Sequence, residues 1–180
     1  MESTPPQHHT QDLGTMVGLF WIESGKTYLG MPPVPPAPGV LLSPAGVQVV
    51  GPDAAQWPWS DVTDLRVTEA PVRSTAARWA ARAASVAAAA LDAWVPGSPT
   101  EMTAVIAIGG NEHKTPVFSA ASSAYTQREV DLSHGLLARF ARGTSSPSVL
   151  SDWWNGDGQP SGVLPSRHRE ALLESWLRVG

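Results

Sequence analysis

"GVLLSPAGVQVVGPDAAQWPWSDVTDLRV", residues 39–67, is the stretch of sequence that decides the fold class. Two apolar runs, residues 39–43 and 46–51, are joined through the turn-forming residues Pro44-Ala45-Gly46 and predict a β-hairpin. A further run begins after Pro58 and contains strand-favouring side chains, with Leu65 on one face and Val62 on the other. The stretch therefore predicts an antiparallel sheet built from short hairpins.

The segments on either side extend this pattern. Residues 16–24 and 26–31 flank Ser24-Gly25 and predict a first hairpin, while the proline-rich residues 32–38 predict an extended connection. Residues 102–109 and 114–120 predict two more strands, joined by a turn at 110–113. We therefore expect seven short strands in all.

The middle of the chain changes to the helical period. Residues 74–94 are rich in alanine, which has the highest helix propensity, and place Trp79, Val86 and Trp94 on one face. After the last strand, Thr126 and Glu129 have the spacing of a capping box, and Gly143 supplies the stop. These patterns predict an inserted helix and a second helix that closes the strand-rich part.

The C-terminal residues predict a further helix. Residues 166–179 carry an apolar stripe at helical spacing, formed by Leu172, Leu173, Trp176 and Leu177. Residues 151–162, which contain Trp153 and Trp154, predict a loop. Because neighbouring side chains on an extended segment point in opposite directions, one of these two tryptophans is expected in the core and the other at the surface.

Residues 16–143 resemble a known family. The stretches GVLLSPAGVQVVG, WPWSDVTDLRV and REVDLSHGLLARF are similar to the paired strands, the Trp-bearing strand and the closing helix of bacterial pleckstrin-homology (PH) or GRAM-like domains. The resemblance implies an α+β fold, a seven-stranded antiparallel bent sandwich or barrel with a capping helix. It also implies a binding function, as is usual for this family. The Ala-rich helix and the C-terminal helical extension lie outside the family pattern.

The domain organisation follows from this resemblance. We expect a disordered tail at residues 1–12, a PH-like domain at 13–143 with the helical insertion at 74–95, and an extension at 144–180 with an amphipathic helix at 166–179. PH domains that hold phosphoinositides place several Lys and Arg residues around the first hairpin. Lys26 stands there beside Glu23, so phosphoinositide binding is not expected.

Composition narrows the function classes. The net charge of −4, with scattered basic residues, argues against nucleic-acid binding, which needs clustered cations. The chain has no cysteine, which excludes thiolate chemistry, and its start lacks the features of a signal peptide. Its longest apolar run, residues 83–91, is about half of the roughly 20 residues needed to span a bilayer. We expect a cytoplasmic protein, and the preference for Ala, Pro and Arg is typical of GC-rich bacterial genomes.

No catalytic or cofactor motif is recognised. Gly109 and Gly110 do not have the spacing of nucleotide-binding loops, and the acidic residues after position 151 do not match a calcium loop. Asp131, Ser133 and His134 lie too close together on one helix to converge as a triad. We therefore expect no cofactor, no metal site and no enzymatic activity.

The main hypothesis is a non-catalytic protein-interaction or scaffold module that binds a protein partner or a second copy of itself. Its candidate contact residues lie on the Ala-rich helix and on the extension: Trp79, Val86, Trp94, Trp153, Trp154 and Trp176. The alternative is a small-ligand-binding protein or enzyme with a pocket near one strand, formed by Trp57, Trp59, Asp61 and Asp64. Weak peripheral lipid binding is a second alternative.

Overall fold

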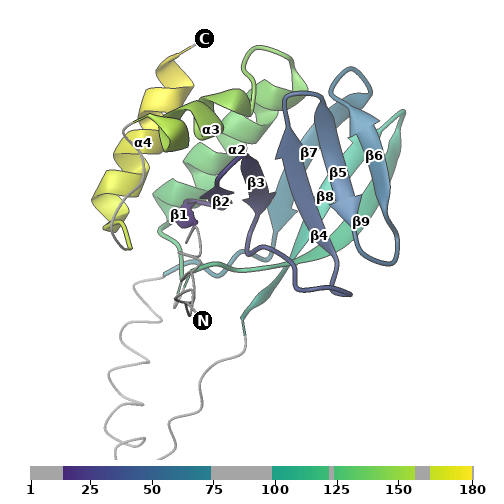
Figure 1. The fold of residues 1–180 in the computed structure, drawn as a ribbon, viewed down its shortest axis with the longest axis horizontal. Helices are drawn as coiled ribbons and strands as arrows, with labels where there is room; N and C mark the ends of the chain where they lie inside the picture. Colours follow the sequence, from purple (N-terminus) through teal and green to yellow (C-terminus); the bar gives the residue numbers. More distant parts are fainter. Residues whose placement is uncertain (1–13, 74–98, 122–123, 157–162, 180) are drawn as a thin grey trace, which may run out of the picture.

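The structure is a computed structural model that describes residues 14–73, 99–121, 124–156 and 163–179. In these residues the fold is α+β, with two antiparallel sheets and three helices (Figure 1). The strands are β1 (Thr15–Val17), β2 (Phe20–Glu23), β3 (Lys26–Leu29), β4 (Gly39–Ser43), β5 (Gly46–Val50), β6 (Ala55–Pro58), β7 (Val62–Thr68), β8 (Glu101–Ile108) and β9 (Asn111–Phe118). Strands β1 to β6 form one sheet in chain order, and β7 to β9 form the other.

The structure divides one of the seven expected strands and adds another, so the described residues contain nine. The first expected strand is interrupted at Gly18, whose φ of 57° lies in the left-handed region. The added strand, β6, lies before the expected fifth strand and ends at Pro58, where a turn closes with a hydrogen bond from the Asp61 amide to the Pro58 carbonyl oxygen at 3.0 Å. Consequently β6 completes the first sheet, and β7 begins the second.

The side chains of strand β7 do not alternate between the two faces as expected. Val62 and Leu65 were expected on opposite faces, but both are buried. The register against β8 shifts between Val62 and Asp64, which is the signature of a β-bulge. The extra residue turns both apolar side chains into the core.

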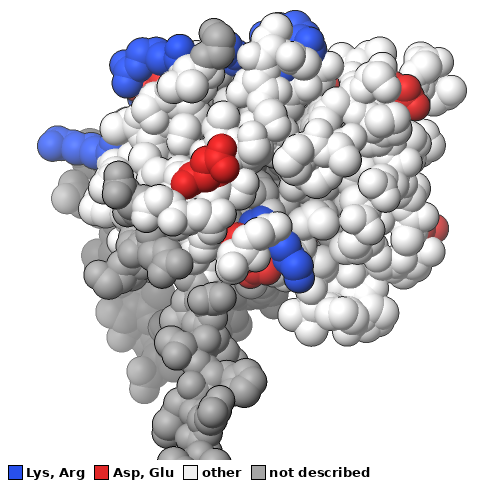
Figure 2. Space-filling view, turned by 45° about the horizontal axis from the view of Figure 1, so that its top comes forward, with Lys and Arg blue, Asp and Glu red and all other residues white. Residues whose placement is uncertain are grey.

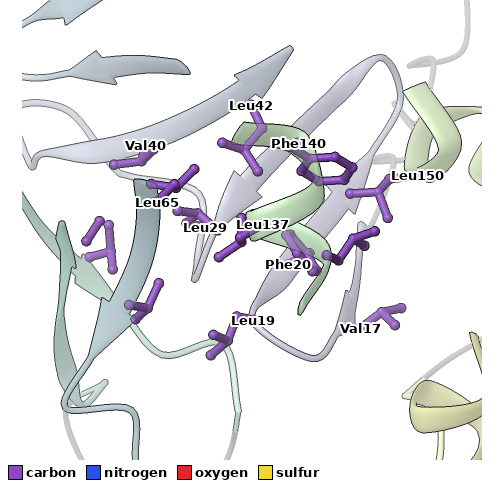
Figure 3. Close-up of a cluster of buried hydrophobic side chains, with 14 of the residues drawn as sticks. Val17, Leu19, Phe20, Leu29, Val40, Leu42, Leu65, Leu137, Phe140 and Leu150 are labelled. Carbon is purple, nitrogen blue, oxygen red and sulfur yellow. The ribbon is translucent and has the colours of Figure 1, made fainter. Parts of the chain in front are cut away.

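The core lies between the two sheets and continues beneath the helices (Figure 3). Strand residues that face each other in register supply one wall, and their side chains are fully or almost fully buried: Phe20, Leu29, Val40 and Val49. Phe140, on helix α2 (Gln127–Ala141), meets Phe20 edge-on with ring centroids 6.4 Å apart. The amide of Met31 donates to the carbonyl oxygen of Phe118 at 2.7 Å and links the two sheets.

Helix α2 begins and ends as predicted. The Thr126 side chain accepts from the Glu129 amide, and the Glu129 carboxylate accepts from the Thr126 amide, so the capping box is confirmed. Gly143 follows the helix with a φ of 67°, as expected of a glycine stop. Helix α4 (Ser166–Arg178) confirms the predicted terminal helix.

We expected a loop at residues 151–162, and this prediction is wrong for residues 151–155. Residues Ser148–Asn155 form helix α3, which was not expected. Leu150 and Trp154 stand four residues apart and are both buried, so one turn of helix brings both to the core. The predicted tail at residues 1–12 and the Ala-rich helix at 74–95 lie outside the described residues.

Candidate functional site

The tryptophans of the extension form one aromatic cluster. On helix α3, the ring of Trp153 lies 6.4 Å from that of Trp154 and 5.6 Å from that of Trp176 on α4. Trp154 and Trp176 are 3% and 6% exposed, whereas Trp153 is partly buried. Both Trp153 and Trp154 therefore pack against the core, because a helix and not an extended strand carries them. The cluster joins α3 to α4 within the chain.

The four residues of the expected ligand pocket take separate partners. Trp59 packs on Phe140 with ring centroids 5.9 Å apart, and its indole Nε1 donates to the Ser43 carbonyl oxygen at 2.8 Å. Trp57 contacts the His113 ring at 4.8 Å, and exposed Asp61 accepts from the Ser60 hydroxyl at 3.0 Å. Asp64 forms an ion pair with Arg66. Trp57 and Trp59 therefore cover the core. Asp61 and Asp64 bond to neighbouring side chains near the surface instead of lining one pocket with them.

Arg66 also pairs with Glu112 across the three-stranded sheet. The hydrogen bond from Arg66 lowers the pKa of the Glu112 carboxyl below its ordinary value. Since these side chains are more than a third exposed, water screens the attraction and the group contributes little to stability. Asp64, Arg66 and Glu112 therefore form a solvated cluster of charges on the three-stranded sheet.

Asp131, Ser133 and His134 also point to different partners. Asp131 accepts from Gln127 at 2.8 Å, and the Ser133 hydroxyl accepts from the Leu19 amide at 3.1 Å and donates to the Glu129 carbonyl oxygen at 2.6 Å. The Nε2 atom of His134 lies 2.9 Å from the Val67 carbonyl oxygen. Each of the three side chains therefore bonds a different part of the fold.

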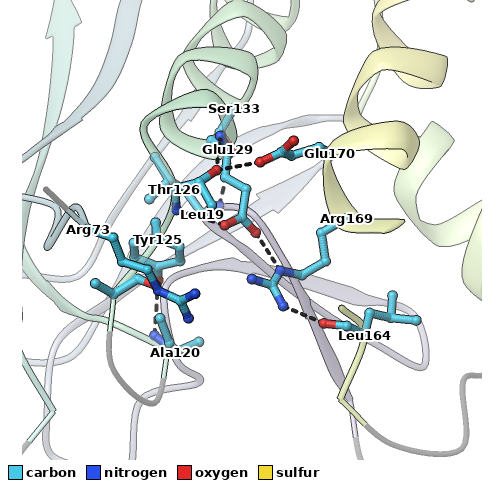
Figure 4. A network of polar contacts seen from close by, with 12 residues as sticks. Leu19, Arg73, Ala120, Tyr125, Thr126, Glu129, Ser133, Leu164, Arg169 and Glu170 are labelled. Atoms are coloured by element: carbon cyan, nitrogen blue, oxygen red, sulfur yellow. Dashed lines mark hydrogen bonds and ion pairs between the residues drawn. The ribbon is translucent and has the colours of Figure 1, made fainter. Parts of the chain in front are cut away.

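A buried ion pair joins α2 to α4 (Figure 4). The side chains of Glu129 and Arg169 are 0% and 6% exposed, and the Arg169 guanidinium also donates to the Leu164 carbonyl oxygen. The hydroxyl of Thr126 donates to Glu170 at 2.6 Å, one residue further along α4. A buried charge is tolerated only when it is paired and hydrogen-bonded, and this geometry meets both conditions.

The sequence reasoning identified Glu129 as a capping residue but missed its partner. Arg169 precedes Leu173 by four residues and Trp176 by seven, so it lies on the apolar stripe of α4. A lone arginine on such a stripe is the signal that could have predicted a buried carboxylate opposite it. The pair makes α4 an integral part of the core and not an arm held away from it.

The outer face of the six-stranded sheet offers the most distinctive surface. A row of side chains crosses it in register from β2 to β6, and we call these residues the outer row: Trp21, Tyr28, Leu41, Gln48 and Gln56. Directly opposite residues in an antiparallel sheet project from the same face. The next residues along the first four of these strands, among them Ile22 and Leu42, are buried, so the outer row faces away from the core.

This face is almost free of charge. In the strands of the six-stranded sheet, Glu23 and Lys26 are the charged residues, and they stand opposite each other at the end of one hairpin. Figure 2 likewise shows charged side chains only as separated groups on the side of the molecule in view. Covering an uncharged surface of aromatic rings and amides avoids the large cost of desolvating charges, provided that the amides form new hydrogen bonds.

The sheet edges, in contrast, are protected against pairing with another strand. Among the described strands, β1 has three residues, β6 ends in Pro58, and β9 contains both Lys114 and Pro116. The remaining edge, β7, packs against α2, where His134 contacts the Val67 backbone. A partner would therefore meet a face of the six-stranded sheet more readily than an edge.

Comparison with protein-family models, with curated proteins and with solved structures gives no match. No helix in the described part of the chain has both the length and the apolar character required to cross a membrane. Within the same residues, no group of three or more His, Asp or Glu side chains is arranged to hold a metal ion. The geometry of the outer row is thus the main guide to function.

Proposed function

We propose that the chain is a non-catalytic protein-interaction module of PH-like fold, and that its outer row is the contact surface. The PH-like assignment draws support from three features: the meander of β1 to β6, the separate sheet of β7 to β9, and the packing of α2 against the core. The observation that carries the interaction role is the outer row itself, an uncharged aromatic and amide surface with no core function.

The proposal revises which residues of the extension meet a partner. Trp154 and Trp176 are buried in the core of the chain, so they contribute to its stability. Trp153 keeps part of its surface exposed and remains a candidate contact. Trp79, Val86 and Trp94 also remain candidates, and they lie outside the described residues. A cytoplasmic location stays part of the proposal.

The chemistry of the outer row favours an uncharged, extended peptide segment. Trp21 and Tyr28 provide flat apolar area with little side-chain entropy to lose, and the amides of Gln48 and Gln56 can both donate and accept. Such a combination binds a polar backbone and small apolar side chains together. A strongly charged ligand would find no partner along the outer row.

Partner capture with charged variants tests the proposal. A photo-crosslinking residue at Gln48 should trap a discrete protein from a lysate of the native host, and Tyr28→Lys with Leu41→Lys should reduce the trapped amount at least tenfold. Thr103→Lys, on the outer face of the second sheet, is the matched control and should leave capture unchanged. Equal capture by all three chains would overturn the assignment of the outer row, and binding to lipid vesicles instead would point to peripheral lipid binding.

A further inference from the structure

Residues 31–38, which we call the proline loop, display apolar side chains between β3 and β4. In the described part of the chain, four large apolar side chains are exposed, and two of them belong to this loop: Met31 at 38% and Val34 at 78%. Pro35 and Pro36 beside them are exposed as well. Apolar side chains that gather at one place on a surface are typical of a contact site.

The proline loop is fixed to both sheets. The Met31 amide donates to a carbonyl oxygen of strand β9 at 2.7 Å. Pro33 lies on β4 so closely that a β-carbon at Gly39 would collide with its ring. The Ala37 amide closes a turn on the Val34 carbonyl oxygen at 2.9 Å. A partner that binds the loop therefore has little conformational entropy to remove.

The prolines set the conformation in which the loop presents its side chains. Met31, Pro32 and Val34 each precede a proline, which favours extended or polyproline II backbone. A polyproline II helix has three residues per turn, so Met31 and Val34 share one edge, about 9 Å apart at roughly 3.1 Å per residue. That edge is the exposed one, since Pro33 packs against β4. Residues 31–35 thus present the pattern apolar-Pro-x-apolar-Pro.

This pattern indicates the kind of partner that the proline loop fits. Grooves lined by aromatic side chains recognise polyproline II segments, whose preformed backbone loses little entropy on binding. Residues 27–52 contain no Asp, Glu, Lys, Arg or His, so a groove with an acidic or basic pocket would find no ion-pair partner in this segment. A lipid surface fits less well, because the loop offers little apolar area and no cation for anionic headgroups.

We infer that the proline loop is a ligand for a protein with an uncharged, aromatic-lined groove of the kind that recognises polyproline II segments. Met31-Pro32 and Val34-Pro35 fill two neighbouring subsites of that groove. The inference goes beyond the proposed function, because it adds a contact that does not depend on the outer row.

Titration of the isotope-enriched full-length chain with an unlabelled WW domain tests the inference. The probe is a WW domain selected for peptides of the form Pro-Pro-aliphatic-Pro, which residues 32–35 match. We expect the backbone amide signals of Met31, Val34 and Ala37 to shift and saturate, while that of Lys114, on the second sheet, stays in place. No saturable shift up to about 1 mM WW domain, or shifts at other residues only, would overturn the inference.

Two matched variants assign the binding to the loop. Val34→Lys should weaken binding by about tenfold or more, because Val34 is the most exposed of the large apolar side chains in the loop. Val163→Lys changes a valine that is 89% exposed elsewhere on the chain and should leave the affinity unchanged. Both side chains are exposed, so both variants should keep the melting temperature of the unsubstituted chain. Equal affinity of the two variants for the WW domain would contradict the inference.

Other occupants of the loop give different results. Shifts at Met31 and Val34 that grow with the concentration of the chain alone would assign the loop to a second copy. Shifts caused by phosphatidylcholine vesicles and not by the WW domain would assign it to a lipid surface. Either result would overturn the inference. The titration does not involve partner capture at Gln48, so failure of one test leaves the other proposal standing.

Discussion

At the scale of single residues, the contacts of Glu129 explain how the C-terminal part of the chain joins the sandwich. One carboxylate oxygen completes the capping box at Thr126, and the other pairs with Arg169. Glu129 and Arg169 are forty residues apart along the chain. A single buried carboxylate therefore both starts one helix and fixes the position of another.

Breaking this pair should be costly, because it leaves a buried charge without a partner. We expect Arg169→Met to lower the free energy of unfolding by about 3–5 kcal/mol, measured by denaturant titration. Glu129→Gln in the same chain should recover part of the loss, since it removes the uncompensated charge. Arg128→Gln, which breaks the exposed pair with Glu174, is the control and should shift the unfolding midpoint far less. A loss of similar size in the control would contradict this account.

At the scale of elements, the helices and strands pack through close approaches at small residues. Gly135 lies within α2, and a β-carbon there would stand 3.5 Å from the Leu177 side chain on α4, which is ordinary van der Waals contact. Gly18 differs, because its φ is 57° and a β-carbon would collide with the Ser133 hydroxyl. The structure therefore has room for a side chain at Gly135 but not at Gly18.

This difference predicts opposite effects of the same substitution. Gly135→Ala should stabilise the protein by up to about 1 kcal/mol, since alanine has the higher helix propensity and the space accepts its methyl group. Gly18→Ala should destabilise it, because it combines an unfavourable φ with a collision in the core. Thermal unfolding of the two variants beside the unsubstituted chain measures both. A fall in melting temperature for Gly135→Ala would show that α2 and α4 approach too closely there.

At the scale of the whole molecule, the sheets and the three described helices share one hydrophobic cluster. The cluster includes strand residues such as Val17 together with Leu150, Trp154, Leu173 and Trp176 from the extension. The division into a domain at 13–143 and an extension at 144–180 followed the family resemblance, but the packing crosses that boundary. Residues on both sides should therefore unfold together.

Trp176→Ala tests this cooperativity. We expect a loss of about 3–5 kcal/mol, typical of a large aromatic side chain removed from a core, with the whole transition displaced. Tryptophan fluorescence and far-ultraviolet circular dichroism should report the same unfolding midpoint in both chains. Two separate transitions, with only the earlier one displaced, would mean that the extension unfolds independently.

Local patterns were enough to predict several elements. The capping box of α2, its glycine stop, the hairpin of β4 and β5, and helix α4 each depend on residues within a few positions of one another. Helix α3 escaped prediction because it is short and ends at Asn155, followed by Gly156, and both residue types also mark loops. The bulge in β7 escaped because an extra residue changes the pairing without changing the composition.

By itself, the sequence determined the α+β class, most element positions and the low surface charge, because periodicity and turn chemistry act over short distances. Only the tertiary structure decided that Arg169 meets Glu129, that Trp57, Trp59, Asp61 and Asp64 take separate partners, and that Trp21, Tyr28 and Leu41 align in one row. Strand register and helix docking bring together residues that are distant along the chain. Those contacts depend on how whole faces pack, which no single segment encodes.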